Sequence, residues 1–243
     1  MSLKLPEVTL MAIDCLAPGN TVLAMQQAMR LVRFGRMVLL TDTVRHQLIE
    51  PKPATLGIEV FHTEQSDNKI RPYPNAPLVC PDANMDELVK PADYCETDYQ
   101  LYMEWDSCVL NPLAWDDTWL EYDFIGAPWV DHCDPGWPPC DEHNNVGNFG
   151  FSLRSRRFCK MIKDAVTEHW TNPDIRRQMT ICDSFACRTM RPWLEQGGIR
   201  FAPEDVAARF SCENRVYSGA FGYHGRLTAK LNGWGNWMEL VNR

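Results

Sequence analysis

The chain has 243 residues, of which 45% are hydrophobic and 23% charged, with a net charge of −8 and a pI near 5.3. A chain of this length can bury one large core or two small ones, and we expect one globular domain over residues 1–243. The net negative charge argues against a broad nucleic-acid-binding surface, which needs clustered Lys and Arg. No apolar run approaches the ~18–20 residues of a membrane span, and without a visible secretory signal we expect a cytoplasmic protein whose ten cysteines are reduced thiols.

The first sixty residues have the pattern of a strand–helix–strand unit. Residues 8–13 and 37–42 are continuous apolar runs, which are typical of central parallel strands. Between them, Asn20 is expected to cap a helix with one apolar face, and Gly35 is expected to end it. The unit should be right-handed. Asp42 at the end of the second strand would accept hydrogen bonds from a nucleotide or cap the following turn, and the sequence leaves both open.

Two proline-rich stretches interrupt the pattern. Between residues 50 and 91, a short strand over 58–61 is followed by four prolines, which predict a long irregular loop of the kind that is usually functional or mobile. A second loop carries four side chains that would suit zinc: His132, Cys133, Cys140 and His143. Their spacing fits no common zinc module. We therefore favour ordinary loop residues over a zinc site.

Two acids end the next predicted strand, over residues 98–106. Apolar and polar side chains alternate along it, which places Glu104 and Asp106 on one face at the end of the strand. Carboxylates that lie so close repel each other unless a proton or a cation sits between them. Ligands of open α/β sheets bind at the carboxyl ends of strands. The pair therefore predicts a site for Mg²⁺ or Mn²⁺, with a solvated pair at a turn as the alternative.

The second half contains three further candidates for ligand binding. Gly147 and Gly150 flank Asn148 in the stretch 145–154, so that backbone can approach a ligand there, and a strand with a bulge is the alternative. Asp183 lies in the first turn of a predicted helix that ends at Gly197, where it would serve chemistry or the helix dipole. His224 lies beside Gly225 at the end of an element. Further strands are expected over 122–129 and 199–202, and further helices after Ser155 and at Pro203.

Several common catalytic motifs are absent from the sequence. It contains no Gly-rich phosphate loop, no Gly-x-Ser-x-Gly elbow and no His-Glu-x-x-His motif. Hydride transfer, serine hydrolysis and zinc proteolysis therefore lose support.

Taken in order, these stretches resemble a bacterial and viral family of inferred glycosyltransferases that was long described only as a domain of unknown function. The resemblance covers residues 8–225, with residues 62–95 divergent. Ser107 and Phe149 replace glycines of the family pattern, and Cys182 replaces a glutamate. The matching stretches are Glu104-Trp105-Asp106-Ser107, Phe124-Ile125-Gly126-Ala127-Pro128-Trp129, Gly147-Asn148-Phe149-Gly150-Phe151-Ser152-Leu153-Arg154-Ser155, Cys182-Asp183, Cys187-Arg188, residues 199–203 and Phe221-Gly222-Tyr223-His224-Gly225.

The resemblance implies a GT-A-like α/β fold, in which a Rossmann-type mixed sheet is flanked by helices. The nucleotide-binding half would span roughly residues 1–110 and the acceptor half roughly 111–243. By the same resemblance, Glu104, Asp106 and His224 would hold Mn²⁺ or Mg²⁺, and Asp183 would be the catalytic base. Residues expected to contact a nucleotide-sugar donor are Asp42, Trp105, Gly147, Asn148, Gly150 and Arg154.

The activity implied is metal-dependent transfer of a sugar from a nucleotide sugar to a hydroxyl acceptor. Direct displacement with one base predicts inversion at the anomeric carbon. The acceptor stays open between a glycan, a protein, a small molecule and a modified DNA base. Two other functions compete: a nucleotide-sugar-binding protein that has lost catalysis, suggested by the replaced glycine and glutamate, and a metal-dependent phosphohydrolase or nucleotidyltransferase that uses the same carboxylates.

Overall fold

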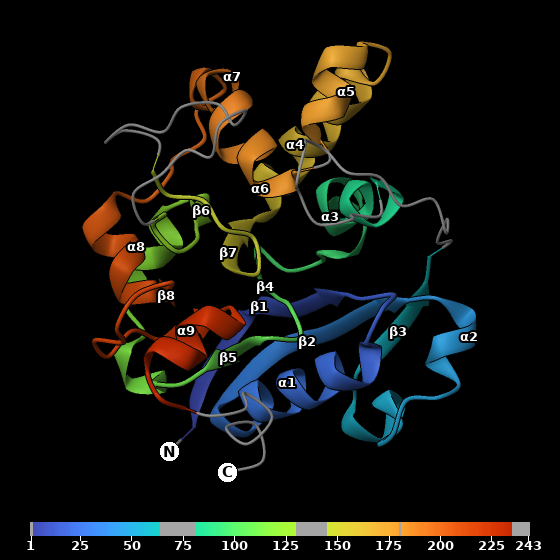
Figure 1. The fold of residues 1–243 in the computed structure, drawn as a ribbon, viewed down its shortest axis with the longest axis vertical. Coiled ribbons are helices and arrows are strands. Elements are labelled where there is room, and N and C mark those ends of the chain that lie inside the picture. The colour runs from blue at the N-terminus through green and yellow to red at the C-terminus, as the bar shows by residue number, and fades with distance from the viewer. Residues whose placement is uncertain (1, 64–80, 130–144, 180, 235–243) are drawn as a thin grey trace.

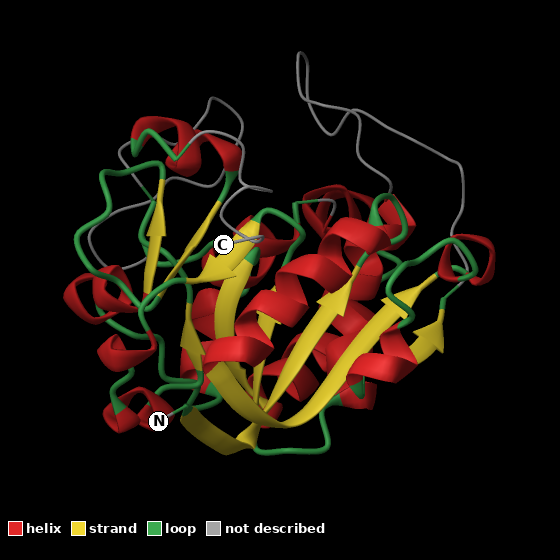
Figure 2. Cartoon of the chain, turned by 90° about the horizontal axis from the view of Figure 1, so that it is seen from below, coloured by secondary structure: helices red, strands yellow, loops and turns green. Residues whose placement is uncertain are grey.

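A computed structural model describes residues 2–63, 81–129, 145–179 and 181–234. Its centre is a six-stranded mixed sheet in the order β3-β2-β1-β4-β7-β6 (Figures 1 and 2). Four strands run parallel, β7 is antiparallel to β4, and β6 is antiparallel to β7. The predicted α/β class, a mixed sheet flanked by helices, is confirmed. The strands are β1 (Leu3–Ile13), β2 (Val32–Thr41), β3 (Glu59–His62), β4 (Tyr99–Met103), β6 (Phe124–Ile125) and β7 (Phe151–Ser155).

Helices cover both faces of this sheet. Helix α1 (Pro18–Leu31) lies on one face, while α3 (Pro81–Tyr94) and α4 (Arg156–His169) pack together on the other (Figure 1). Alternate side chains of a strand point to opposite faces. Accordingly, Leu10 and Leu39 belong to the larger buried cluster, which includes α1, and their neighbours Met11 and Val38 belong to a smaller one. Both faces are thus apolar, as continuous apolar strands require.

A second, three-stranded sheet in the order β5-β9-β8 continues directly from β4. It consists of β5 (Ser107–Val109), β9 (Gly222–His224) and β8 (Ser211–Glu213). Only residues 104–106 separate β4 from β5, so the paired acids lie at the junction of the two sheets. The remaining elements are α2 (Thr43–His46), η1 (Pro53–Leu56), η2 (Pro112–Ala114), η3 (Asp117–Glu121), α5 (Pro173–Met179), α6 (Cys182–Ser184), η4 (Phe185–Thr189), α7 (Arg191–Gln196), α8 (Glu204–Phe210) and α9 (Arg226–Leu231).

The strand–helix–strand unit is confirmed, but both predicted ends of its helix are wrong. Helix α1 begins at Pro18, whose missing N–H costs nothing at the first helical position. The preceding loop is held by Asp14, whose Oδ1 accepts hydrogen bonds from the N–H groups of Leu16 and Ala17. The helix ends at Leu31, and Gly35 lies inside β2. A Cβ there would lie 2.0 Å from the carbonyl oxygen of Pro6, so glycine lets β1 and β2 approach at their register shift.

The proline-rich stretch also differs from the prediction. Helix α3 occupies residues 81–94, although it contains Pro91. The helix predicted around Asp183 is divided into α6, η4 and α7. The strand predicted over 122–129 is shorter and consists of β6 alone. The strand predicted over 199–202 forms one isolated β-bridge, between Phe201 and Phe124. The apolar side chains in these three stretches are buried between other elements. An apolar pattern therefore indicated burial correctly but did not indicate how long each helix or strand is.

Other predictions concern the surface and the thiols. Of the seven cysteines in the described ranges, six are buried and Cys182 is half-buried. None of the helices in those ranges has the length and apolar composition that a membrane span needs. The four candidate zinc ligands of the 130–144 loop lie outside the described residues.

Candidate metal and active site

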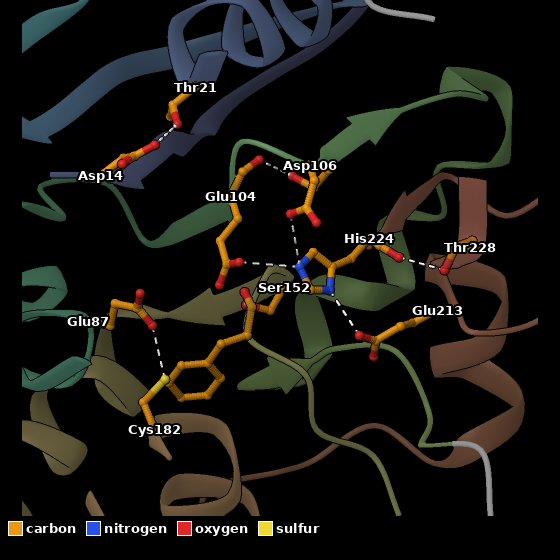
Figure 3. Close-up of polar contacts among 12 residues, drawn as sticks. Asp14, Thr21, Glu87, Glu104, Asp106, Ser152, Cys182, Glu213, His224 and Thr228 are labelled. Carbon is orange, nitrogen blue, oxygen red and sulfur yellow. Dashed lines mark hydrogen bonds and ion pairs between the residues drawn. The ribbon is translucent and has the colours of Figure 1, made fainter. Parts of the chain in front are cut away.

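Glu104, Asp106 and His224 converge at the junction of the two sheets (Figure 3). One potential ligand atom from each lies within 4.8 Å of the others. The antiparallel pairing of β5 with β9 sets Ser107 opposite His224, and this brings the imidazole to the acids. Its Nε2 lies 3.3 Å from Glu104 Oε2 and 3.4 Å from Asp106 Oδ1.

The two acids meet for a different reason from the one that the sequence suggests. The strand ends at Met103, and residues 104–107 form a turn in which the N–H and the hydroxyl of Ser107 both donate to the carbonyl of Glu104. Ser107 thus closes the turn where the family pattern has glycine. A turn, rather than strand alternation, therefore directs both carboxylates toward His224.

Glu213 orients His224 from the opposite side. The parallel pairing of β8 with β9 aligns the two residues, and His224 Nδ1 lies 3.0 Å from Glu213 Oε1. An N–H at Nδ1 would donate a hydrogen bond to this carboxylate, and Nε2 then points at Glu104 and Asp106. Burial acts to lower the pKa of His224, but its hydrogen bonds to Asp106, Glu104 and Glu213 outweigh burial and raise the pKa well above the usual value.

The residues fit a hard divalent cation. Two carboxylates and an imidazole are donors that Mn²⁺ and Mg²⁺ accept. Asp106 Oδ1 is buried without a hydrogen-bond partner of good geometry. Burial acts to raise the pKa of Asp106, yet the interaction with His224 outweighs it and lowers the pKa, so this carboxylate is charged. In the metal-free protein the proton on His224 balances the acids, and a bound cation would replace it.

We expect Glu213→Gln to weaken Mn²⁺ binding by about tenfold, because a partner that orients a ligating histidine is worth about 10–100-fold in affinity. Direct titration of Mn²⁺ into the two proteins measures the effect. The matched control is Glu121→Gln, an exposed carboxylate whose nearest cation is Arg200 at 3.8 Å. Equal Mn²⁺ affinities in wild type and Glu213→Gln would show that Glu213 does not orient a ligand.

The glycines around Asn148 make room for protein groups. A Cβ on Gly150 would lie 2.2 Å from His224 Nε2, and one on Gly147 would lie 1.8 Å from the Trp129 ring. The carbonyl of Gly150 also accepts a hydrogen bond from the N–H of Glu104. Asn148 has φ 46°, is 5% exposed, and its Oδ1 has no hydrogen-bond partner. The predicted contact of this loop with a donor thus falls on Asn148 more than on the glycines.

Two other predicted donor contacts are engaged within the protein. Asp42 caps α2 by accepting from the N–H groups of Val44 and Arg45, and its second oxygen pairs with the Arg45 guanidinium at 2.8 Å. Arg154 is 1% exposed and lies between the rings of Tyr102 and Phe149. Asp42 and Arg154 thus have structural roles, and their contact with a nucleotide stays a prediction.

Trp105 and Asp183 remain at the edge of the triad. Trp105 is half-buried, and the Arg226 guanidinium lies 4.2 Å from its ring centre. Asp183 accepts a hydrogen bond from the Ser184 N–H. Burial raises the pKa of Asp183 to about 6, and although this hydrogen bond and Arg188 oppose the shift, the charges of Glu213 and Glu104 add to it. Asp183 therefore lies within the electrostatic field of the triad.

Sequence reasoning missed Glu213 and Glu87. Glu213 ends a three-residue strand, which is too short to show a periodic pattern. Glu87 lies on α3, in the stretch interpreted as a loop because of its prolines. The spacing of Leu88, Ala92 and Cys95 on one helical face was the available signal.

A cavity of about 280 Å³ lies at the same edge of the main sheet. Its walls come from the loop after β1, the start of α1, and the α2 region after β2. This is the carboxyl end of two adjacent parallel strands, where open α/β sheets bind ligands. The lining residues are Leu16, Ala17, Pro18, Gly19, Asn20, Arg45, Leu48 and Ile49.

Comparison with solved structures identifies the fold. The galactosyltransferase LgtC, solved in complex with donor and acceptor sugar analogs, superposes with a TM-score of 0.54 at 14% identity, covering 97% of this chain and 95% of that one. The apo-form glycosyltransferase GlyE of Streptococcus pneumoniae TIGR4 superposes with a TM-score of 0.49 at 12% identity. That alignment covers all of this chain and 62% of GlyE, so the chain spans less than two thirds of it. A glycosyltransferase involved in glycosylation of the major capsid of PBCV-1 superposes with a TM-score of 0.47 at 11% identity. That alignment covers 97% of this chain and 98% of the other.

The likeness to LgtC shows a shared GT-A-like fold. No match was found among curated proteins. Residues 92–224, more than half of the chain and including the whole triad, match the family described as "Protein of unknown function (DUF5672)". The chain therefore belongs to the DUF5672 family.

Proposed function

We propose that this protein is a metal-dependent glycosyltransferase that moves a sugar from a nucleotide-sugar donor to a hydroxyl acceptor. The observation that carries the proposal is the triad of Glu104, Asp106 and His224 at the carboxyl edge of a GT-A-like sheet. LgtC, which has this fold, was solved with donor and acceptor sugar analogs. A nucleotide sugar presents a diphosphate, and two carboxylates cannot hold a diphosphate without a cation between them.

The donor would extend along the edge of the sheet. The cavity between the β1 loop and α2 would take the nucleoside, and Glu104, Asp106 and His224 would hold Mn²⁺ or Mg²⁺ against the diphosphate. Asn148, with its unpartnered buried Oδ1, would contact the donor next to His224. Trp105, which lies between the two acids in sequence, would border the same region.

The chemistry requires one base and a stabilised leaving group. When bound, the cation supplies charge neutralisation to the nucleoside diphosphate as it leaves. Asp183 would accept the proton of the acceptor hydroxyl while the hydroxyl oxygen forms its bond to the anomeric carbon and the bond to the diphosphate breaks. A single displacement of this kind inverts the anomeric centre.

A nucleotide-sugar-binding protein without catalysis is the second candidate, and Cys182 favours it. This residue replaces the family's glutamate, and burial, with Glu87 and Asp183 nearby, raises the pKa of its thiol well above the usual value. A neutral thiol cannot replace a carboxylate as a base. Catalysis would then depend on Asp183 as the base. If Asp183 does not act as a base, the protein would bind the nucleotide sugar without transferring the sugar.

We expect one nucleotide sugar in a panel of UDP-, GDP- and dTDP-linked sugars to stabilise the protein against heat, and only when Mn²⁺ is present. At ~100 times its dissociation constant, such a ligand adds ~2.7 kcal/mol to the free energy of unfolding. EDTA should remove the shift. Stabilisation by no nucleotide sugar with Mn²⁺ would contradict the proposal.

Release of nucleoside diphosphate then separates the candidate functions. Release that depends on an added hydroxyl acceptor supports a transferase. Saturable binding without release indicates the binding protein. Turnover of plain nucleotides in place of nucleotide sugars indicates a phosphohydrolase or nucleotidyltransferase built on the same carboxylates.

A further inference from the structure

Glu87 brings another carboxylate to the region of the triad, from a helix that carries none of the family motifs. It lies on α3, and the Cys182 thiol of α6 donates to its Oε2 at 3.0 Å (Figure 3). Burial raises the pKa of Glu87 to about 8, and the charge of Glu104 adds to this effect. The Glu87 side chain lies on the Glu104 side of the triad (Figure 3).

The positive charge of Arg154 favours the charged form of this carboxylate, whereas the negative charges of Glu104 and Asp183 oppose it. Among the described residues, its only hydrogen bond comes from a thiol, which is a weak donor. Glu87 is half-buried, and an acid with few partners in such a position costs free energy that an apolar side chain of similar size would not cost. The acid is better explained by a ligand than by packing.

The local geometry holds Glu87 in place. Pro91, four residues on in α3, has no N–H, so the Glu87 carbonyl loses its helical donor. Arg154 Nη1 reaches this carbonyl at 3.5 Å. The same guanidinium lies 4.1 Å from the centre of the Tyr102 ring. Arg154 thus ties the Glu87 turn of α3 to Tyr102 on β4.

Tyr102 supplies a second, independent sign of a ligand. The residue is fully buried, and its hydroxyl has no hydrogen-bond partner. Burial raises the pKa of Tyr102 well above its usual value, and Glu87 and then Glu104 are the largest charges that add to it. The geometric link between Tyr102 and Glu87 is Arg154, whose guanidinium lies 4.1 Å from the Tyr102 ring centre and reaches the Glu87 carbonyl. A buried hydroxyl left without a partner is unfavourable, and a ligand hydroxyl would supply the missing partner.

Resting on the proposed function, we propose that Glu87 and Tyr102 form the subsite that binds hydroxyl groups of the transferred sugar. In a nucleotide sugar, the sugar is attached to the phosphate that the triad would hold, so groups bordering Glu104 face the sugar. A sugar hydroxyl both donates and accepts. It would donate to the Glu87 carboxylate and accept from the Tyr102 hydroxyl, and it would thereby satisfy both groups.

The first test is Glu87→Gln, titrated by calorimetry in saturating MnCl₂. The two ligands are the nucleotide sugar that the panel selects and the corresponding nucleoside diphosphate. At pH 8.5, above the pKa of about 8 at which Glu87 ionises, we expect the affinity for the nucleotide sugar to fall at least about tenfold, because a hydrogen bond to a charged group is worth about that much. The affinity for the nucleoside diphosphate should change less than about twofold. The matched control is Asp93→Asn on the same helix, an exposed acid paired with Lys163, which should change neither affinity.

The second test is Tyr102→Phe, which separates a ligand contact from a structural role. Removing a hydroxyl that has no partner should leave the melting temperature unchanged or raise it, while the affinity for the nucleotide sugar falls and that for the nucleoside diphosphate stays. Unchanged nucleotide-sugar affinity in both variants, or an equal loss for both ligands, would overturn the subsite and leave the proposed function standing. Failure of the wild type to bind any nucleotide sugar would overturn the proposed function and the subsite with it.

Discussion

Asp106→Asn is expected to abolish the Mn²⁺-dependent strengthening of donor binding while the protein stays folded. Asp106 is a half-buried carboxylate that the interaction with His224 keeps charged, and its Oδ1 lies 3.4 Å from His224 Nε2. An amide oxygen carries no charge and binds a hard cation weakly. Since orienting partners alone are worth about 10–100-fold, loss of a ligand should cost more than about 100-fold in Mn²⁺ affinity.

The stability of this variant can be predicted separately. The pKa of Asp106 is lowered in the folded protein, so the charged form stabilises the metal-free fold above the ordinary pKa, and this contribution is lost as the pH falls through the lowered value. At neutral pH Asp106→Asn should therefore melt somewhat below wild type.

Titration of the nucleotide sugar with and without Mn²⁺ measures the binding effect, and circular dichroism checks the fold. Asp164→Asn, a change at an exposed acid of α4, is the matched control. An Mn²⁺ effect in Asp106→Asn equal to that in wild type would remove Asp106 from the metal site.

Asp183→Asn has the second large expected effect: a fall in turnover number of about 10²–10⁴-fold with donor affinity unchanged. A general base must be a carboxylate to accept the acceptor's proton, and an amide cannot do so. The amide oxygen still accepts the hydrogen bond from the Ser184 N–H. As a helix-dipole partner alone, Asp183 would contribute about 0.3–1 kcal/mol to stability and nothing to turnover.

The pH profile tests the same assignment. With a pKa of about 6, Asp183 is increasingly deprotonated as the pH rises through 6, so turnover by the wild type should rise over this range and then level off. Asp183→Asn should lack this rise. The raised pKa also means that the charged form is less favourable in the folded protein than in the unfolded chain, so Asp183→Asn should be no less stable than wild type at pH 7.

Nucleoside diphosphate release in the presence of acceptor gives the turnover, and calorimetry gives the donor affinity. Equal turnover in wild type and Asp183→Asn would exclude Asp183 as the base and transfer the assignment to Asp205 at the start of α8. The neighbouring Glu204 is a weaker substitute because Asn145 and Arg215 already engage it. A loss of donor affinity that matches the loss of rate would make Asp183 a binding residue.

The sequence alone determined the elements whose side chains repeat over many residues. The apolar runs in β1 and β2 predicted parallel core strands, the alternation over 98–106 predicted β4, and the residues after Ser155 predicted α4. It also located the paired acids and His224. These features are local, because the period of a strand or helix is written in consecutive residues.

Only the tertiary structure decided which residues meet. Ser107 and His224 pair across β5 and β9 although 117 positions separate them, and this pairing brings Glu213 to Nδ1. Three-residue strands carry no periodic signal, so their partners depend on the packing of the whole chain. The same holds for Arg154, whose guanidinium is buried by Tyr102 and Phe149, and for Glu87, which reaches Cys182 only because α3 folds over the sheet. A sequence names the groups that can do chemistry, but distances between remote groups are set by the long-range contacts of the folded chain.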